Sequence, residues 1–186
     1  MTISVLAACC PNPRQSGSVA AMEEMEILGV RAELPGNAPI VMLQERGGQG
    51  RILSIFIGAP EATAIVLALD GVEPPRPMTH DLFHQVLDEL GATPERVVVT
   101  ELRDGTFYAD LYVRLGNDVH VVSSRPSDAI ALAVRCQTPV FVETDVLDAA
   151  AAVPETDDDD DEPLADEVVE AFRDFIDNVS PEDFES

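Results

Sequence analysis

The sequence contains no lysine and no tryptophan, and its 11 basic residues, all arginine, face 35 Asp and Glu for a formal net charge of −24. Proteins that hold nucleic acid mainly by charge present a basic face that displaces counterions from phosphates. Anionic membrane surfaces are likewise bound through clusters of basic residues. The composition therefore excludes a conventional basic groove for nucleic acid and an electrostatic membrane-binding surface.

Cysteine is also scarce, with three residues at Cys9, Cys10 and Cys136. Their spacing fits neither a disulfide framework nor a zinc finger. No run of 18 apolar residues is present, so no transmembrane helix is expected. The apolar segment 3–10 lacks the positive n-region and the length of a secretory signal. Together these absences predict a protein of the reducing cytoplasm with no membrane contact.

Charge is unevenly spread along the chain. Residues 155–186 hold 15 acids and one arginine, whereas the preceding 154 residues hold 20 acids and 10 arginines. The acidic run within 154–163 predicts a solvated linker, because its like charges repel one another. Residues 164–186 regain helical periodicity with apolar side chains on one face, which predicts an amphipathic C-terminal helix and tail. This helix would dock onto its own domain or bind a partner protein.

At the other end, residues 1–21 are expected to form a disordered extension, unless translation begins at Met22. The domain itself is predicted over 22–153. Periodicity and turn signals divide it into strands over 25–34, 39–46, 51–57, 97–103, 106–115, 119–123 and 139–143, and helices over 60–69, 79–90, 126–135 and 145–152. Hairpin signals dominate over βαβ spacing, so we expect an α+β fold with a largely antiparallel sheet and helices packed on it.

Two parts of this domain look alike. Each has a hairpin followed by a helix that starts with proline, and the segment 64–69 is echoed by 129–134. A duplicated hairpin–helix unit would explain the likeness. Chance similarity between two helices rich in Ala, Ile and Leu is the alternative.

The first candidate site lies where a proline-rich segment meets a helix. Prolines at 74, 75 and 77 hold an extended approach, and Thr79 as N-cap places His80 and Asp81 on the first helical turn. Free N–H groups and the helix dipole favour an anion there. The structural alternative is that Asp81 pairs with the dipole and His80 makes a local hydrogen bond.

The second candidate site is the strand-to-helix turn at 123–129. Arg125 there can clamp a phosphate through its planar fork, and Asp128 can bind a divalent cation or act as a base. Glu61 stands at the corresponding position of the first half and follows the same logic. The alternative is an ordinary helix start in which Arg125 pairs with Asp128.

These segments also carry a resemblance to a known family. The motifs IGAPEA, PRPMTHDL, FYA and RPSDAIALA, at 57–62, 75–82, 107–109 and 125–133, resemble the bifunctional nuclease domain in order and spacing. The likeness covers roughly 22–153, and segment 172–184 is similar to the C-terminal segment of bacterial members.

The resemblance implies a nuclease that hydrolyses phosphodiester bonds of DNA or RNA, since plant members degrade both. It implies a divalent cation, Mg²⁺ or Mn²⁺, as cofactor. The site residues selected in this way are His80, Asp81 and Asp128 for catalysis, Arg76, Arg125 and Ser127 for phosphate, and Asp128 with Glu61 for the metal ion.

One departure from the family pattern supports a second hypothesis. Members usually carry Asp-Ala before the Arg-Pro-Ser-Asp motif, where this chain has Ser123-Ser124, so one potential metal ligand is absent. The alternative is a non-catalytic protein-interaction or ligand-binding module that uses the sheet surface and the acidic tail helix. With either function we expect a homo-oligomer, because so many short hairpins leave sheet edges to cover.

Overall fold

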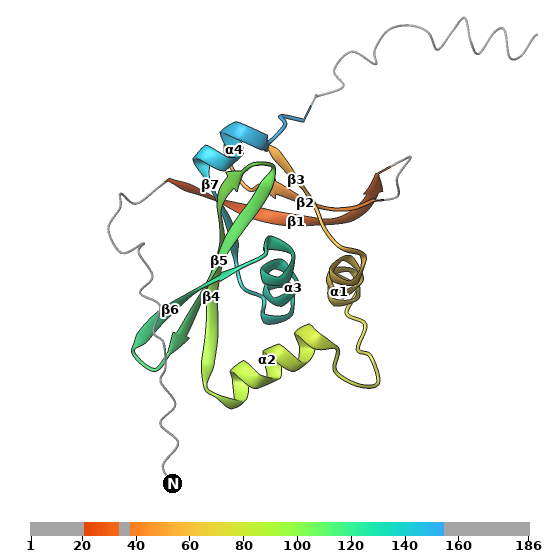
Figure 1. The fold of residues 1–186 in the computed structure, drawn as a ribbon, viewed down its shortest axis with the longest axis vertical. Coiled ribbons are helices and arrows are strands. Elements are labelled where there is room, and N and C mark those ends of the chain that lie inside the picture. The colour runs from red at the N-terminus through yellow and green to blue at the C-terminus, as the bar shows by residue number, and fades with distance from the viewer. Residues whose placement is uncertain (1–20, 34–37, 155–186) are drawn as a thin grey trace, which may run out of the picture. The chain divides into compact units, whose positions relative to one another are not determined.

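The computed structural model describes residues 21–33 and 38–154. The predicted acidic linker, the C-terminal helix and nearly all of the N-terminal extension lie outside these residues. The elements (Figure 1) are β1 (Met22–Glu33), β2 (Ala38–Glu45), β3 (Ile52–Phe56), α1 (Ala59–Leu69), α2 (Thr79–Glu89), β4 (Ala92–Arg103), β5 (Thr106–Leu115), β6 (Asp118–Ser124), α3 (Pro126–Cys136), β7 (Val140–Glu143) and α4 (Thr144–Ala150).

The strands form one seven-stranded sheet in the order β3-β2-β1-β7-β4-β5-β6. Neighbouring strands run antiparallel except for β4 and β7, which are parallel. The predicted α+β class with a largely antiparallel sheet is therefore confirmed. Parallel pairing needs a crossover connection, and α3 lies within the connection that returns the chain to β7.

The two similar parts of the sequence occupy opposite ends of this sheet. Each is a three-stranded antiparallel meander followed by a helix, β1-β2-β3-α1 in one case and β4-β5-β6-α3 in the other. Strand β7 lies between β1 and β4 and joins the two meanders. Each of these units is one strand longer than the hairpin–helix unit that a duplication would repeat according to the sequence, and the duplication itself stays a hypothesis.

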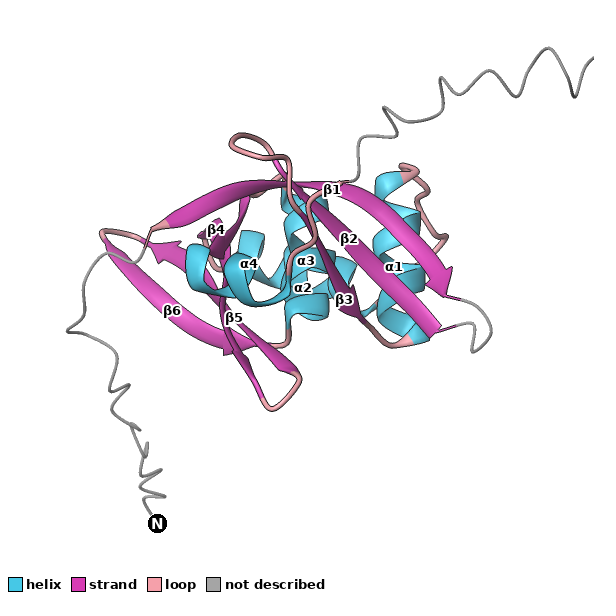
Figure 2. Ribbon diagram, turned by 90° about the horizontal axis from the view of Figure 1, so that it is seen from above, coloured by secondary structure: helices cyan, strands magenta, loops and turns pink. Residues whose placement is uncertain are grey.

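The helices form layers on the twisted sheet. Helices α1 and α3 contact each other on one side of it, α2 packs against α3, and α4 lies on the opposite side of β1–β3 (Figures 1 and 2). Helix α3 is the centre of the core, because its small and branched apolar side chains allow close approach. Its buried residues are Pro126, Ser127, Ala129, Ile130, Ala131, Leu132 and Ala133.

Among the boundaries that differ from the prediction, two have a clear physical cause. Strand β4 begins at Ala92 rather than Val97, and its register with β5 shifts between Pro94 and Arg96. Proline has no N–H to donate to a neighbouring strand, and the β-bulge lets the strand accommodate Pro94. The N-cap of α2 is Met78 rather than Thr79, because the Asp81 carboxylate accepts a hydrogen bond from the Met78 N–H (2.8 Å).

Helix α2 is the least covered of the three helices on its side of the sheet. Leu87 is its buried residue, whereas Leu82, Phe83, Val86 and Leu90 are exposed. Among the residues that the structure describes, none of the helices is long and apolar enough to cross a membrane.

Candidate functional site

An acidic residue occupies the third position of each helix on this side of the sheet. These residues are Glu61 in α1, Asp81 in α2 and Asp128 in α3. A carboxylate at this position faces the unpaired N–H groups of the first turn and the positive end of the dipole. What distinguishes the three acids is the second partner that each one contacts.

Arg125 joins two of these acids. Its Nε donates to Asp128 Oδ2 (2.6 Å), and its Nη2 donates both to Asp128 Oδ1 (3.0 Å) and to Glu61 Oε1 (2.8 Å). One guanidinium nitrogen thus bridges the first turns of α1 and α3. The hydrogen bond that Arg125 donates to Asp128, followed by the one that it donates to Glu61, raises the pKa of Arg125 above its usual value. The Arg125 side chain is nevertheless 66% exposed, so a ligand can reach it.

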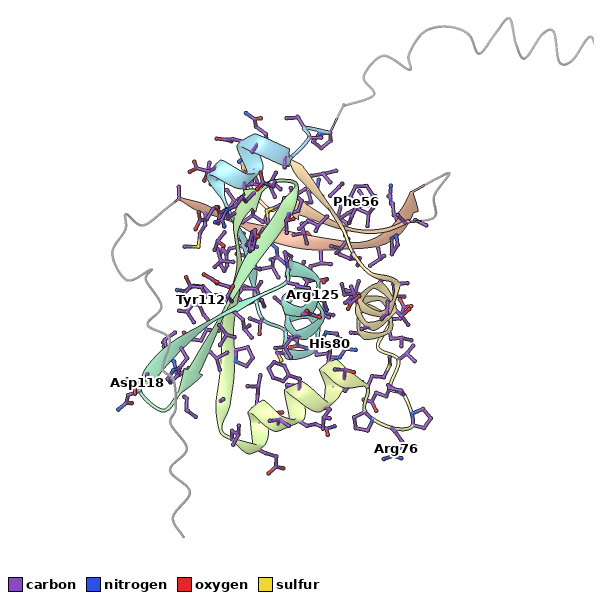
Figure 3. The ribbon with its side chains drawn as sticks, in the orientation of Figure 1. Phe56, Arg76, His80, Tyr112, Asp118 and Arg125 are labelled. Atoms are coloured by element: carbon purple, nitrogen blue, oxygen red, sulfur yellow. The ribbon has the colours of Figure 1, made fainter. Side chains whose placement is uncertain are left out.

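His80 contacts the same carboxylate from α2. Its Nε2 lies 3.3 Å from Asp128 Oδ1, and its side chain is 15% exposed. A carboxylate can only accept, so the contact is a hydrogen bond when Nε2 carries the proton, which leaves Nδ1 as the proton-accepting nitrogen. Asp128 therefore positions both a guanidinium and an imidazole. Figure 3 shows Arg125 and His80 close together between the helices.

We name these four residues the Arg125 cluster: Glu61, His80, Arg125 and Asp128. The cluster carries a net charge of −1 when His80 is neutral. In the described part of the chain no three His, Cys, Asp or Glu side chains gather as a metal-binding group. Magnesium, however, is commonly held by one or two carboxylates, with water and substrate phosphate completing its shell. Glu61 and Asp128 fit that requirement, and a cation there would compete with the Arg125 guanidinium.

Three other residues selected from the sequence do not join the Arg125 cluster. Arg76 is exposed on the loop between α1 and α2 and points away from the cluster (Figure 3). Ser127, the residue before Asp128, is buried. Asp81 is directed toward Met78 and Arg135. Their proposed roles in phosphate binding and catalysis stay predictions.

Asp81 instead takes part in a contact that ties three helices together. Arg135 Nε donates to Asp81, while its Nη1 donates to Ala131 O (2.7 Å) and its Nη2 to Ala64 O (3.1 Å). Burial acts to raise the pKa of Asp81, but the hydrogen bonds from Arg135 and Met78 outweigh it and lower that pKa. Arg135 is 54 residues away in sequence, and no spacing rule links it to Asp81.

The environment of Cys136, a free cysteine of intermediate exposure, disfavours its thiolate form. Burial raises its pKa to about 11, with a further contribution from the charge of Asp88. The thiolate is the reactive form, and at neutral pH this thiol is protonated.

Two cavities border the Arg125 cluster, and the sequence did not indicate either. One of about 550 Å³ is lined by His80 and Asp128 together with apolar residues of α2, including Phe83. The other, of about 360 Å³, is lined by Arg125 and Ser127 together with Phe56 and other residues of β3 and the β4–β5 turn. The sequence feature that could have indicated the first cavity is the apolar face of α2, which remains partly exposed to solvent in the structure.

Comparison with known proteins identifies the family of this chain. Residues 41–155 match the bifunctional nuclease domain, more than half of the chain, and the chain belongs to this family. It is 43% identical over 168 residues to an uncharacterized protein of Mycobacterium tuberculosis, an alignment that covers 89% of this chain and 99% of that protein.

Plant relatives match over a shorter part of the chain. The chain is 31% identical over 107 residues to bifunctional nuclease 1 of Arabidopsis thaliana, covering 56% of this chain and 33% of that protein. It is 27% identical over 119 residues to bifunctional nuclease 1 of Oryza sativa subsp. indica, covering 62% of this chain and 35% of that protein. The chain thus spans about a third of the plant proteins.

Proposed function

We propose that this protein is a nuclease that hydrolyses phosphodiester bonds of DNA or RNA at the Arg125 cluster with the help of Mg²⁺ or Mn²⁺. The observation that carries the proposal is a single guanidinium nitrogen shared by Glu61 and Asp128, with His80 on the same Asp128 carboxylate. The names of the plant relatives support the reaction class.

Arg125 is the group that binds the substrate phosphate. A guanidinium fork matches two phosphate oxygens, and two-thirds of this side chain is open to solvent. When Arg125 turns to a phosphate, it releases Glu61 and Asp128 from their hydrogen bonds. These two carboxylates would then hold the divalent cation. A bound cation of this kind lowers the pKa of a coordinated water and polarises a phosphoryl oxygen.

His80 is the group that moves a proton. Its contact with Asp128 fixes the ring orientation and places the exchangeable proton at a defined nitrogen. General acid–base catalysis by such a side chain contributes typically about 10²- to 10⁴-fold.

Electrostatics support the requirement for a cation. The cluster alone is net negative, and the chain carries a formal charge of −24, so an approaching phosphodiester is repelled. Glu61 and Asp128 would hold a divalent cation whose charge would reverse the local sign. The proposal therefore predicts no cleavage when divalent cations are removed.

The test uses the purified full chain and labelled single-stranded DNA and RNA, with Mg²⁺, Mn²⁺ or EDTA. We expect cleavage with either metal ion and none with EDTA. Asp128→Asn is expected to lower the rate at least about 100-fold, because it removes the negative charge that faces His80 and Arg125 and that would hold a cation. The matched control is Asp118→Asn, at the exposed start of β6, which should cleave like the wild type. Equal rates for all three proteins would show a contaminating nuclease and contradict the proposal.

A further inference from the structure

The two cavities lie on either side of one ion pair. The first, here named the Phe83 cavity, contains Asp128 in its lining, and the second, the Phe56 cavity, contains Arg125. Because Arg125 and Asp128 are hydrogen-bonded through two nitrogens, the cavities meet at the Arg125 cluster. A ligand centred on Arg125 therefore has one open, partly apolar recess to each side.

The Phe83 cavity has the character of a site for a flat, mostly apolar ring. Its volume of about 550 Å³ lies within the range of small-molecule sites. Phe83 is 47% exposed at this surface. The remaining lining is mainly apolar, with hydroxyl groups at Thr79, Ser123 and Ser124 that can bond to polar ring edges.

The Phe56 cavity offers a second ring-binding surface. Phe56 is 62% exposed, an unusual state for so large an apolar side chain, and Phe107 lies beside it in the cavity lining. Its volume is about 360 Å³. Ser127, buried in the first turn of α3, and Thr106 supply hydroxyl groups to the same lining.

We propose that these cavities bind the two nucleobases that flank the phosphodiester held at Arg125, with Phe83 and Phe56 as the stacking surfaces. This inference rests on the proposed function, because it places the phosphate at Arg125. Stacking on an aromatic side chain requires a base that is not stacked within a duplex, so the site selects single strands or splayed ends.

The charge of the molecule is the independent argument for this assignment. A chain with 35 acids and 11 arginines cannot gain affinity for a polyanion by releasing counterions from many phosphates. Binding must then come from uncharged contacts close to the cluster. Aromatic and apolar surface exposed on both sides of Arg125 provides those contacts.

The test measures binding of a fluorescein-labelled single-stranded DNA octamer by anisotropy, in Ca²⁺, for the full-length protein. Phe83→Ala and Phe56→Ala are each expected to raise the dissociation constant about 5- to 150-fold, the range for loss of one stacked base. Phe83→Trp should retain binding. The matched control is Leu90→Ala, at the C-cap of the same helix, which is more exposed than Phe83 but absent from the cavity lining and should bind like the wild type. Thermal melting confirms that each variant is folded.

The salt dependence provides a second readout. Binding through stacking and one arginine should change little between 50 and 200 mM salt, whereas many phosphate contacts would give a steep loss of affinity.

The outcomes separate this inference from the proposed function. Cleavage by the wild type with unchanged binding and cleavage in both phenylalanine variants overturns the inference and leaves the nuclease in place. Binding that depends on Phe83 and Phe56, without cleavage under any metal ion, supports the inference and overturns the nuclease. If Phe83→Ala binds the octamer like the wild type but no longer self-associates, this surface contacts a second copy of the chain. That result overturns the inference.

Discussion

Arg125 takes the place between two carboxylates that a divalent cation takes in many phosphate-processing sites. Part of this arrangement is predictable, since Arg125 and Asp128 are three residues apart at a helix start and can pair locally. Glu61, 64 residues away, was selected only because the two halves of the sequence look alike. The contact between His80 and Asp128 joins two motifs whose proximity no spacing rule indicates.

At the residue scale, replacing Arg125 should affect metal and substrate in opposite directions. Arg125→Gln removes the positive group that competes for Glu61 and Asp128, so Mn²⁺ should bind more tightly, by up to about fivefold as for exposed ion pairs. The same variant should bind single-stranded DNA more weakly, because the phosphate loses its fork. Isothermal titration with Mn²⁺ and with the octamer measures both. Weaker Mn²⁺ binding by the variant would show that the two carboxylates are not the cation site.

At the scale of elements, the sequence predicts most helices and strands because their limits coincide with proline and glycine. It fails where tertiary contacts decide. Strand β4 continues through Pro94 because β5 tolerates a bulge there. Helix α2 has the apolar face of a core helix, yet Phe83 and Leu82 remain exposed, since neighbouring elements cover only part of that face.

A second element-scale feature is the ion pair that holds the β2–β3 hairpin to α4. Arg51 donates to both oxygens of buried Glu45 (3.1 and 3.0 Å) and to Asp148 (2.6 Å). The hydrogen bond from Arg51 outweighs the effect of burial and lowers the pKa of Glu45. The pair therefore stabilises the fold above the ordinary pKa of a glutamate, and this contribution is lost as pH falls through the lowered folded value.

Arg51→Met is expected to lower the free energy of unfolding at pH 7 by about 3 kcal/mol, because Glu45 is left buried without its cation. The difference from the wild type should shrink as the pH falls below the ordinary pKa of a glutamate, because the wild type then loses the contribution of the ion pair through the lowered folded pKa of Glu45. Urea unfolding at several pH values measures this. The control is Arg46→Met, whose partner Glu24 is exposed, with an expected loss of at most about 1 kcal/mol. A loss for Arg51→Met that is small, or the same at every pH, would contradict the account.

For the molecule as a whole, the composition predicted that no basic groove is present, and the hairpin signals predicted the α+β class of the fold. The order of strands could not be predicted from the sequence, because the position of β7 between two meanders depends on contacts between distant segments. The cavities escaped prediction for the same reason. Three different elements supply Phe56, Phe83 and Phe107. Only the folded chain brings Phe56 and Phe107 into one cavity lining with Arg125, and Phe83 into another with Asp128.

The edge of the sheet carries a prediction about assembly. In the described part of the chain, β6 pairs on one side only, with β5, and Val119, Val121 and Val122 are exposed on it. The opposite edge strand, β3, is partly covered by a bridge between Ile52 and Ala152. We expect β6 to pair with a second copy, so light scattering should give a mass of at least twice 20.0 kDa. A mass of one chain at micromolar concentration would refute this expectation.

Under the proposed function, Glu61 and Asp128 act together in one phosphodiesterase site. Cleavage rates of single-stranded RNA in Mn²⁺ for the wild type, Glu61→Gln, Asp128→Asn and the double variant, purified in parallel, test it most directly. Residues that work as a unit give strongly non-additive effects. We predict that each single change lowers the rate at least about 100-fold and that the double variant is only a fewfold slower than the slower single variant. Four equal rates, or losses that simply multiply, would contradict the account.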